Sequence, residues 1–307
     1  MALCLPPGGR TPKPPWDPPL ASIPSPGHDA WRLGPLPVRA YALCVTAGIL
    51  VAVLVASRRY RRSGGRAGVI LDVAAWAVPF GLAGAVLHAL LIDARHDFTG
   101  QYRLWHAVTA GVAVIGIPGA VALGALGAWI ACRRAGPQPL PLGPVAGAVA
   151  PALMFGLAIG TMGNWWAQQF YGRPSSWWWA VQISPTHRVP GYENYGTFQP
   201  AFGYQSLWDV AVGFGVIWAA RRLALSGERT FMLAAACYAA GSWWVESVRI
   251  GPQPRLLGIS YGALGDIVVF ALAVAGLYLT RPRGTPPART YSKAALVDDS
   301  SGDVMSM

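Results

Sequence analysis

The sequence predicts an all-α polytopic membrane protein with seven transmembrane helices, an external N-terminus and a cytoplasmic C-terminus. Three observations support this fold class. Of the 307 residues, 53% are apolar and only 12% are charged, unlike the balance of a soluble domain. The apolar residues form runs of about 20, the length that crosses a bilayer. Short clusters of arginine follow every second run.

The seven expected helices follow directly from these apolar runs. Each run is interrupted by arginines, prolines or a polar segment, which marks where a helix leaves the bilayer. Polar residues and tryptophan pairs blur the ends of the fourth and sixth runs. The helices are expected near residues 37–57, 69–92, 106–132, 142–163, 206–222, 230–250 and 260–280.

The arginine clusters predict the orientation of the chain. Loops rich in Lys and Arg stay in the cytoplasm, and here each odd-numbered helix is followed by such a loop. The N-terminus is therefore expected outside and the C-terminus inside. The arginines concerned are Arg58, Arg59, Arg61, Arg62 and Arg66, then Arg133 and Arg134, then Arg221, Arg222 and Arg229, and finally Arg281 and Arg283.

Composition also divides the chain into a membrane domain and two tails. Residues 1–35 are rich in proline and are expected to form a disordered external tail. Residues 36–283 form the seven-helix domain, and residues 284–307 form a disordered cytoplasmic tail. Within the domain, the polar segment 164–205 contains two clusters of tryptophan, whose rings prefer the headgroup level. We expect it to be a small external head lying on the bilayer.

Several function classes are excluded by the same features. The net charge of +11 does not indicate a nucleic-acid partner, because the cations lie in short loops between apolar runs. The four cysteines have no CxxC spacing, so neither a zinc site nor a disulfide framework is supported. His88 and His106 are expected near helix ends without any metal-ligand spacing. No metal and no cofactor are predicted.

The sixth expected helix carries a polar stripe. Tyr238, Ser242, Glu246 and Arg249 are spaced four, four and three residues apart, which places them on one helix face. A carboxylate inside a membrane helix costs about 2.5 to 3.5 kcal/mol, so Glu246 should face protein or a water-filled cavity. Arg249 can pair with it. The alternative is that both side chains reach outward into the interface.

The end of the fourth expected helix is a second polar cluster. Small residues and amides occur together in Gly160-Thr161-Met162-Gly163-Asn164, and Gln168 and Gln169 follow. Such a cluster at the outer mouth of a bundle can bind a polar lipid headgroup. It can equally be an ordinary helix end closed by Gly and Asn. Asp72, Asp209 and Asp266 are expected toward helix ends, where they need no special role.

The segment from Gly160 to Val181 resembles the signature of the prolipoprotein diacylglyceryl transferase family, Gly-Arg-x-Gly-Asn-x-x-Asn-x-Glu-x-x-Gly-Arg. The Gly-Ile-Pro-Gly motif with the later Ala-Trp-Ile-Ala-Cys-Arg-Arg is similar to the family's actinobacterial branch. Together the similar segments cover the whole membrane core. They are residues 33–41, 116–119, 124–134, 204–207, 238–249 and 258–262.

The resemblance implies a reaction and a location. Enzymes of this family move the diacylglyceryl group of phosphatidylglycerol onto the lipobox cysteine thiol of a preprolipoprotein. The expected partners are therefore phosphatidylglycerol, a preprolipoprotein lipobox peptide and membrane lipids. The location implied is the bacterial inner membrane, as a multi-pass protein whose external head is periplasmic.

The resemblance also implies which residues form the site. Residues expected to be catalytic are Tyr41, Asn164, Tyr238 and Glu246. Residues expected to bind the lipid headgroup are Thr161, Gly163, Gln169, Ser242 and Arg249.

Several family residues are nevertheless replaced in this chain. Thr161 and Ser242 stand in place of arginines, and Ala85 stands where an arginine is usual. Ala167 replaces an asparagine and Gln169 a glutamate. Arg249, Arg173 and Arg188 are the cations left to replace the lost charge. The alternative function is thus a catalytically impaired paralogue that binds phospholipid or lipoprotein precursor without turnover. A transporter or channel is less well supported, because no internal repeat is present.

Overall fold

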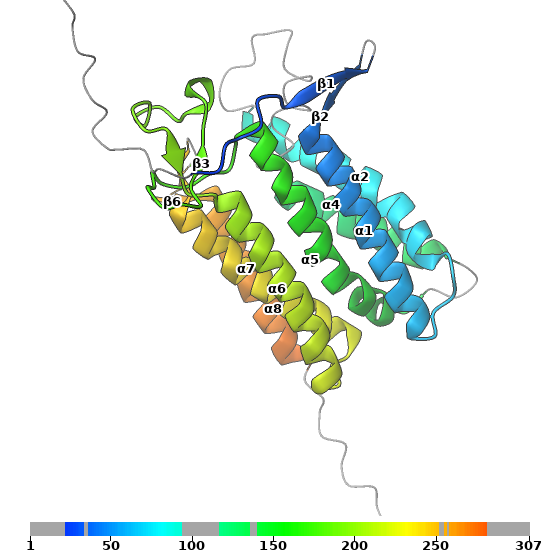
Figure 1. Ribbon diagram of the computed structural model, residues 1–307. Coiled ribbons are helices and arrows are strands. Elements are labelled where there is room, and N and C mark those ends of the chain that lie inside the picture. The colour runs from blue at the N-terminus through cyan, green and yellow to red at the C-terminus, as the bar shows by residue number, and fades with distance from the viewer. Residues whose placement is uncertain are drawn as a thin grey trace, which may run out of the picture.

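The computed structural model describes residues 22–33, 36–93, 117–135, 140–251, 255–256 and 258–280. They form a bundle of long helices with short strands and loops gathered at one end (Figure 1). The helices are α1 (Ala40–Arg62), α2 (Val69–Asp93), α4 (Ile117–Arg134), α5 (Leu142–Ala167), α6 (Ala201–Arg222), α7 (Gly227–Val248) and α8 (Tyr261–Leu279).

A helix is found in each of the seven expected runs, although residues 106–116 of the third run lie outside the described part. Four of the helices are long and apolar enough to cross a membrane, namely α1, α2 as far as Leu87, α5 and α8. The prediction of a helical membrane protein is confirmed at this level. α6 and α7 are less apolar because they carry the buried polar residues described below.

Helix α5 lies at the centre of the arrangement. It packs against α1 on one side and against α6 and α7 on the other, while α2 packs on α4 and α8 on α7 (Figure 1). One core cluster joins the ends of α1, α2 and α4 to α5, and another joins α5 to α6 and α7. Both halves of the bundle therefore share a core cluster with α5.

Glycines make the close approach of α1 and α5 possible. A Cβ atom added to Gly156 would lie 2.8 Å from the carbonyl oxygen of Gly48 and 3.0 Å from the Cβ of Ala52. Between membrane helices, such small residues allow backbones to come into van der Waals contact, which replaces the missing hydrophobic driving force. This contact holds α1 against α5 near the middle of both helices.

The strands lie together at one end of the bundle. β1 (Ala30–Leu33) pairs with β2 (Leu36–Arg39), β3 (Val181–Gln182) with β4 (Thr197–Phe198), and β5 (Arg255–Leu256) with β6 (Ile259–Ser260), all antiparallel. A short 3₁₀ helix, Pro185–His187, lies between β3 and β4. We call residues 168–200 the head.

Tyr171 fixes the fold of the head. Its hydroxyl donates to the carbonyl of His187 over 2.6 Å and accepts from the backbone N–H of Val189 over 2.9 Å. Burial raises the pKa of this hydroxyl, which keeps it a donor. The head is further joined to the end of α7, because Ile250 donates to the carbonyl of Tyr171 and Arg173 to that of Val248.

The described arginines of the predicted cytoplasmic loops lie at the helix ends away from the head. α1, α4 and α6 all begin toward the head and end in arginines. Arg66, in the loop after α1, donates to the carbonyl of Ala135 after α4, and Leu140 before α5 donates to the carbonyl of Cys132. The alternation of helix directions therefore collects these arginines at one end.

The glycine contact between α1 and α5 gives a test of the bundle. Gly156→Leu forces bulk against the Gly48 carbonyl, and overpacking of this kind costs about 1 to 3 kcal/mol. We expect a lower unfolding temperature for the purified variant in detergent. Gly215→Leu is the matched control, because no atom lies within 4 Å of its added Cβ. Equal unfolding temperatures for the two variants would contradict this account of helix packing.

Candidate functional site

The end of α7 near the head carries the expected ion pair. Glu246 Oε2 lies 3.4 Å from Arg249 Nη1, and their side chains are only 10% and 16% exposed. Ser260 Oγ, at the start of α8, donates to Glu246 Oε1 over 3.2 Å. The carboxylate also lies against Gly262, where an added Cβ would be 3.0 Å from Oε1. The pair thus points into the protein, which excludes the alternative of two side chains reaching outward.

The surroundings of Glu246 suit a negative charge. Its carboxylate faces the first turn of α8, where unpaired backbone N–H groups give a helix a partial positive charge. Ser260 also accepts from the backbone N–H of Ala263 and so closes that turn. Arg249 stacks over the ring of Phe170, with its Cζ 4.9 Å from the ring centroid. Its Nε has no hydrogen-bond partner among the described residues, so the guanidinium keeps an unused donor.

The rest of the α7 stripe faces carboxylates of the neighbouring helices. Ser242 is the hydrogen-bonding neighbour of Tyr238, and the nearby charges are Asp209 on α6 and Asp266 on α8. Asp266 in turn lies near Ser242 and Glu246. The polar stripe is therefore an interior surface shared by three helices.

The structure corrects the expectation that Asp209 lies toward a helix end, whereas Asp266 lies in the second turn of α8 as expected. Asp209 is fully buried; its Oδ1 accepts from Gln205 Nε2 over 2.8 Å, and its Oδ2 has no partner among the described residues. The sequence placed it at a helix end because α6 was expected to begin near residue 206. The helix instead begins at Ala201, directly after Pro200. The signal in the sequence that could have identified Asp209 is a carboxylate within an apolar run.

A second group of expected residues lies where α5 meets α1. An added Cβ at Gly163 would lie 3.0 Å from the Cα of Tyr41, so these two residues are in direct backbone contact. Asn164 is buried and donates from Nδ2 to the carbonyl of Thr161 over 2.8 Å. Its Oδ1 has no partner among the described residues. A buried, unused amide oxygen is a candidate acceptor for a substrate hydroxyl or amide.

Gln169 is not part of this group, because its side chain is exposed. The preceding residue, Gln168, has a left-handed backbone with φ of 48° and ends α5. Its side-chain oxygen accepts from the backbone N–H of Ser184 over 2.7 Å and also from the Ser184 hydroxyl. The side-chain amide that makes contacts here is thus that of Gln168, and it binds Ser184 in the head.

The two groups meet through the first residues of the head. Gly172 forms an antiparallel bridge with Arg249, and Phe170 lies under the Arg249 guanidinium. Both follow directly on the end of α5 that carries Asn164. The ends of α5 and α7 nearest the head therefore lie under the same cap of loops (Figure 1).

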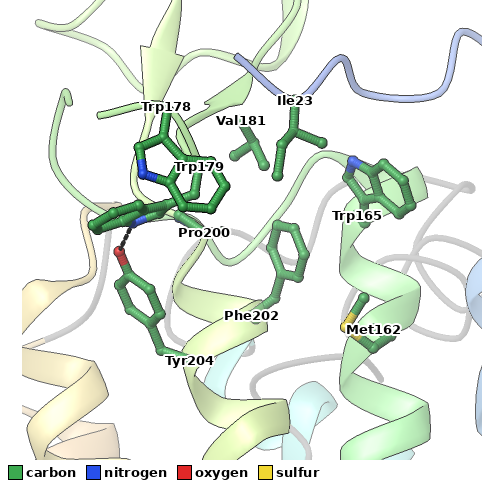
Figure 2. A pocket seen from close by; sticks show the side chains of 10 residues that line it. Ile23, Met162, Trp165, Trp178, Trp179, Val181, Pro200, Phe202 and Tyr204 are labelled. Carbon is green, nitrogen blue, oxygen red and sulfur yellow. Dashed lines mark hydrogen bonds between the residues drawn. The ribbon is translucent and has the colours of Figure 1, made fainter. Parts of the chain in front are cut away.

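The structure adds an apolar cavity that the sequence did not predict. It has a volume of about 480 Å³ and lies between the head and the adjacent ends of α5 and α6 (Figure 2). Trp179 Nε1 donates to the Tyr204 hydroxyl over 2.9 Å at one side of it. The tryptophan clusters gave the only hint in the sequence. The lining residues are Ile23, Met162, Trp165, Trp178, Trp179, Val181, Pro200, Phe202, Gly203 and Tyr204.

The site shows no metal-binding arrangement within the described part of the chain, where no three His, Cys, Asp or Glu side chains gather. The side chains of His88 and His106 lie outside the described residues. The position of Ala85, where the resemblance expects an arginine, is buried on α2.

Known proteins with similar sequences place the chain in a family. A family model described as prolipoprotein diacylglyceryl transferase matches residues 28–280. A phosphatidylglycerol–prolipoprotein diacylglyceryl transferase of Streptomyces avermitilis is 42% identical over 278 residues, 88% of this chain and 77% of the relative. Proteins of the same description are 42% identical in Streptomyces griseus, over 83% of this chain and 76% of the relative, and 36% identical in Mycobacteroides abscessus, over 92% and 85%. The resemblance to the actinobacterial branch is thereby confirmed, and the chain belongs to the prolipoprotein diacylglyceryl transferase family.

Proposed function

We propose that this protein transfers the diacylglyceryl group of phosphatidylglycerol to the lipobox cysteine thiol of prolipoproteins. The observation that carries the proposal is the family match from residue 28 to 280, which includes every described helix and the buried α7 stripe. The relatives are named for this activity. Their names favour a transferase over a paralogue that only binds lipid.

The proposed setting is the bacterial inner membrane, crossed by seven helices with the N-terminus outside. The arginine-bearing ends of α1, α4 and α6 support a cytoplasmic location for the end of the bundle away from the head. The head, within residues 164–205, is then periplasmic. The proposed membrane domain is residues 36–283, flanked by segments 1–35 and 284–307, and the first of these segments includes the strand β1.

In the proposed reaction the cysteine sulfur forms a bond to the glycerol carbon that carries the phosphate. The carbon–oxygen bond to phosphate breaks, glycerol phosphate leaves with the electron pair, and the thiol proton passes to a base. The thiolate is the reactive form, and the leaving phosphate needs positive charge or fixed donors. Glu246 and Arg249 together offer a carboxylate and a guanidinium at the outer end of α7.

We assign the remaining roles from the two groups of polar residues. Tyr41, Asn164, Tyr238 and Glu246 are the proposed catalytic residues, and Arg249, Thr161, Gly163 and Ser242 line the headgroup region. Gln169 is the weakest member of the proposed headgroup set, since its side chain is exposed.

Arg249 is the best replacement for the missing arginines. Arg188 is already engaged, because its Nε donates to the carbonyl of Ile183 and its Nη1 to that of Glu193. Arg173 is directed to the carbonyl of Ser247 over 3.5 Å. Arg249 is buried beside Glu246 and keeps its Nε free of partners among the described residues. Hydrogen bonds between guanidinium and phosphate are among the stronger ones in proteins.

Complementation tests the proposed activity. We expect this chain, expressed in a bacterium depleted of its own transferase, to restore diacylglyceryl modification of a reporter lipoprotein, measured by mass spectrometry. A reporter whose lipobox cysteine is replaced by serine is the control and should stay unmodified. An unmodified cysteine reporter, with the protein shown to be inserted and folded, would instead favour the lipid-binding paralogue.

The Glu246–Arg249 pair gives a second test. Glu246→Gln removes the carboxylate charge and leaves Arg249 buried without its counter-ion, so we expect kcat/KM to fall by about 10²-fold or more. Activity is measured with phosphatidylglycerol vesicles and a prolipoprotein peptide. Glu228→Gln, an exposed carboxylate at the other end of α7, is the matched control and should keep full activity. Equal activity of both folded variants would remove Glu246 from the mechanism.

The proposed orientation is tested with reporter fusions at the C-terminus. Green fluorescent protein fluoresces only when it folds in the cytoplasm, and alkaline phosphatase is active only outside it. We therefore expect a fluorescent fusion with the first and an inactive fusion with the second. The reverse pattern would show that the C-terminus lies outside the cytoplasm and would contradict the proposed orientation.

A further inference from the structure

A short N-terminal segment lies along the open edge of β3. The backbone N–H of Ile23 donates to the carbonyl of Ala180 over 2.8 Å, and the N–H of Gln182 donates to the carbonyl of Ile23 over 2.9 Å. Ile23 thereby forms a parallel bridge with Val181. The other edge of β3 is already paired with β4. Residues 22–25, which we call the strap, thus add an extended chain to a strand edge.

Side chains of the strap complete this pairing. Ser25 Oγ donates to the carbonyl of Gln182 over 2.5 Å, and Gln182 Nε2 donates to Ser22 Oγ over 2.8 Å. Both of these hydrogen bonds are exposed to solvent, where they contribute little. Pro24 has no N–H and cannot extend the ladder. The strap is therefore held mainly by two backbone hydrogen bonds and by the Ile23 side chain.

Ile23 reaches from the strap toward the apolar cavity (Figure 2). It lies above Phe202 and near Trp165, and it is still 38% exposed. Trp178, at the rim, is 70% exposed. Ile23 forms part of the wall of this cavity, and about 480 Å³ remains empty beside it. The cavity accepts larger or additional apolar side chains.

The cavity lies beside the proposed reaction site. Met162 and Trp165, which line it, are in the same last turns of α5 as Gly163 and Asn164. Phe202 donates its backbone N–H to the carbonyl of Phe170, whose ring lies under Arg249. An extended chain on the β3 edge would therefore pass close to both groups of proposed site residues.

We propose that the β3 edge and this cavity bind an extended, apolar peptide segment of the prolipoprotein, and that the strap occupies that place in the peptide-free protein. The inference rests on the proposed function and names where its peptide substrate binds. A strand edge recognises main-chain groups of any sequence, and a pocket for alternate side chains adds selectivity. The strap already makes both kinds of contact, since the backbone of Ile23 pairs with β3 and its side chain lines the cavity.

A lipid acyl chain fits these observations less well. An acyl chain can fill an apolar cavity, but it has no donor or acceptor for the carbonyl of Ala180 and the N–H of Gln182. Only a peptide backbone satisfies both. The peptide must displace the strap, so its apparent affinity is reduced in proportion to the fraction of molecules in which the β3 edge is free.

Loosening the strap is the first experiment. Ile23→Asp places a carboxylate against an apolar cavity and should release the strap. We expect the KM for a synthetic lipobox-cysteine peptide to fall about tenfold, with kcat and the KM for phosphatidylglycerol vesicles unchanged. Trp31→Asp is the matched control, since Trp31 lies in β1 on the same N-terminal segment, is 49% exposed and does not line the cavity. A strap that merely stabilises the head predicts the opposite, a lower kcat or a higher KM, and that result would overturn the proposal.

Direct binding separates this inference from the proposed function. The synthetic lipobox-cysteine peptide is labelled with fluorescein and titrated with the protein in detergent. Its fluorescence anisotropy gives the Kd of the peptide and does not depend on diacylglyceryl transfer. We expect Kd to fall in Ile23→Asp and to rise about tenfold in Trp178→Ala, whose exposed ring can be removed without harm to the fold. If the Kd values shift in this way but no diacylglyceryl transfer is detected, only the proposed function is contradicted. Unchanged Kd values, or a shift confined to the KM for phosphatidylglycerol, would refute the peptide site.

Discussion

The cost of placing polar groups in a bilayer decides how this bundle is arranged. Glu246, Asp209 and Asp266 belong to helices in or beside apolar runs, and an isolated carboxylate there is unfavourable. The fold meets this constraint by turning the polar faces of α6, α7 and α8 toward one another. Glu246 forms an ion pair with Arg249 and accepts a hydrogen bond from Ser260, and Asp209 accepts one from Gln205. The hydrophobic faces are left for the lipid, which explains the exposed apolar side chains on these helices, such as Phe214, Trp243 and Leu272.

Close packing on α5 then positions this polar interior next to the second group of residues. Gly156 and Gly163 bring α1 into backbone contact, which fixes Tyr41 against the end of α5. At the other end of α5, an added Cβ at Gly147 would lie 2.7 Å from the Cα of Gly227 at the start of α7. α5 is thus held on both sides with no room for larger residues. Close packing of α1 and α7 on α5, together with the bridge between Gly172 and Arg249 in the head, therefore positions Asn164 relative to the α7 stripe.

The sequence predicts the parts of this arrangement that depend on local patterns. Apolar length predicted the helices, and the spacing of Tyr238, Ser242, Glu246 and Arg249 predicted a shared face, including the pairing of the last two. It did not predict which neighbour that face meets. Asp209 was assigned to a helix end, since the start of α6 at Ala201 depends on the preceding head and not on hydropathy. Gln169 was expected in the site because it occupies the position of the glutamate in the family signature. The left-handed backbone of Gln168, which ends α5, leaves the Gln169 side chain exposed and directs that of Gln168 toward Ser184.

The same limit explains why the strap and the cavity were found only in the structure. Residues 22–25 lie in a proline-rich stretch in which Ile23 is flanked by serine and proline, and such composition indicates a tail when the partner strand is unknown. β3 is only two residues long, which is too short for a pattern of alternation to reveal it. Their pairing joins positions more than 150 residues apart, as the hydrogen bond between Ser25 and Gln182 illustrates with a separation of 157. A weakly held segment on a strand edge is also the arrangement that a competing peptide can displace, because the contacts it must replace are few and mostly exposed.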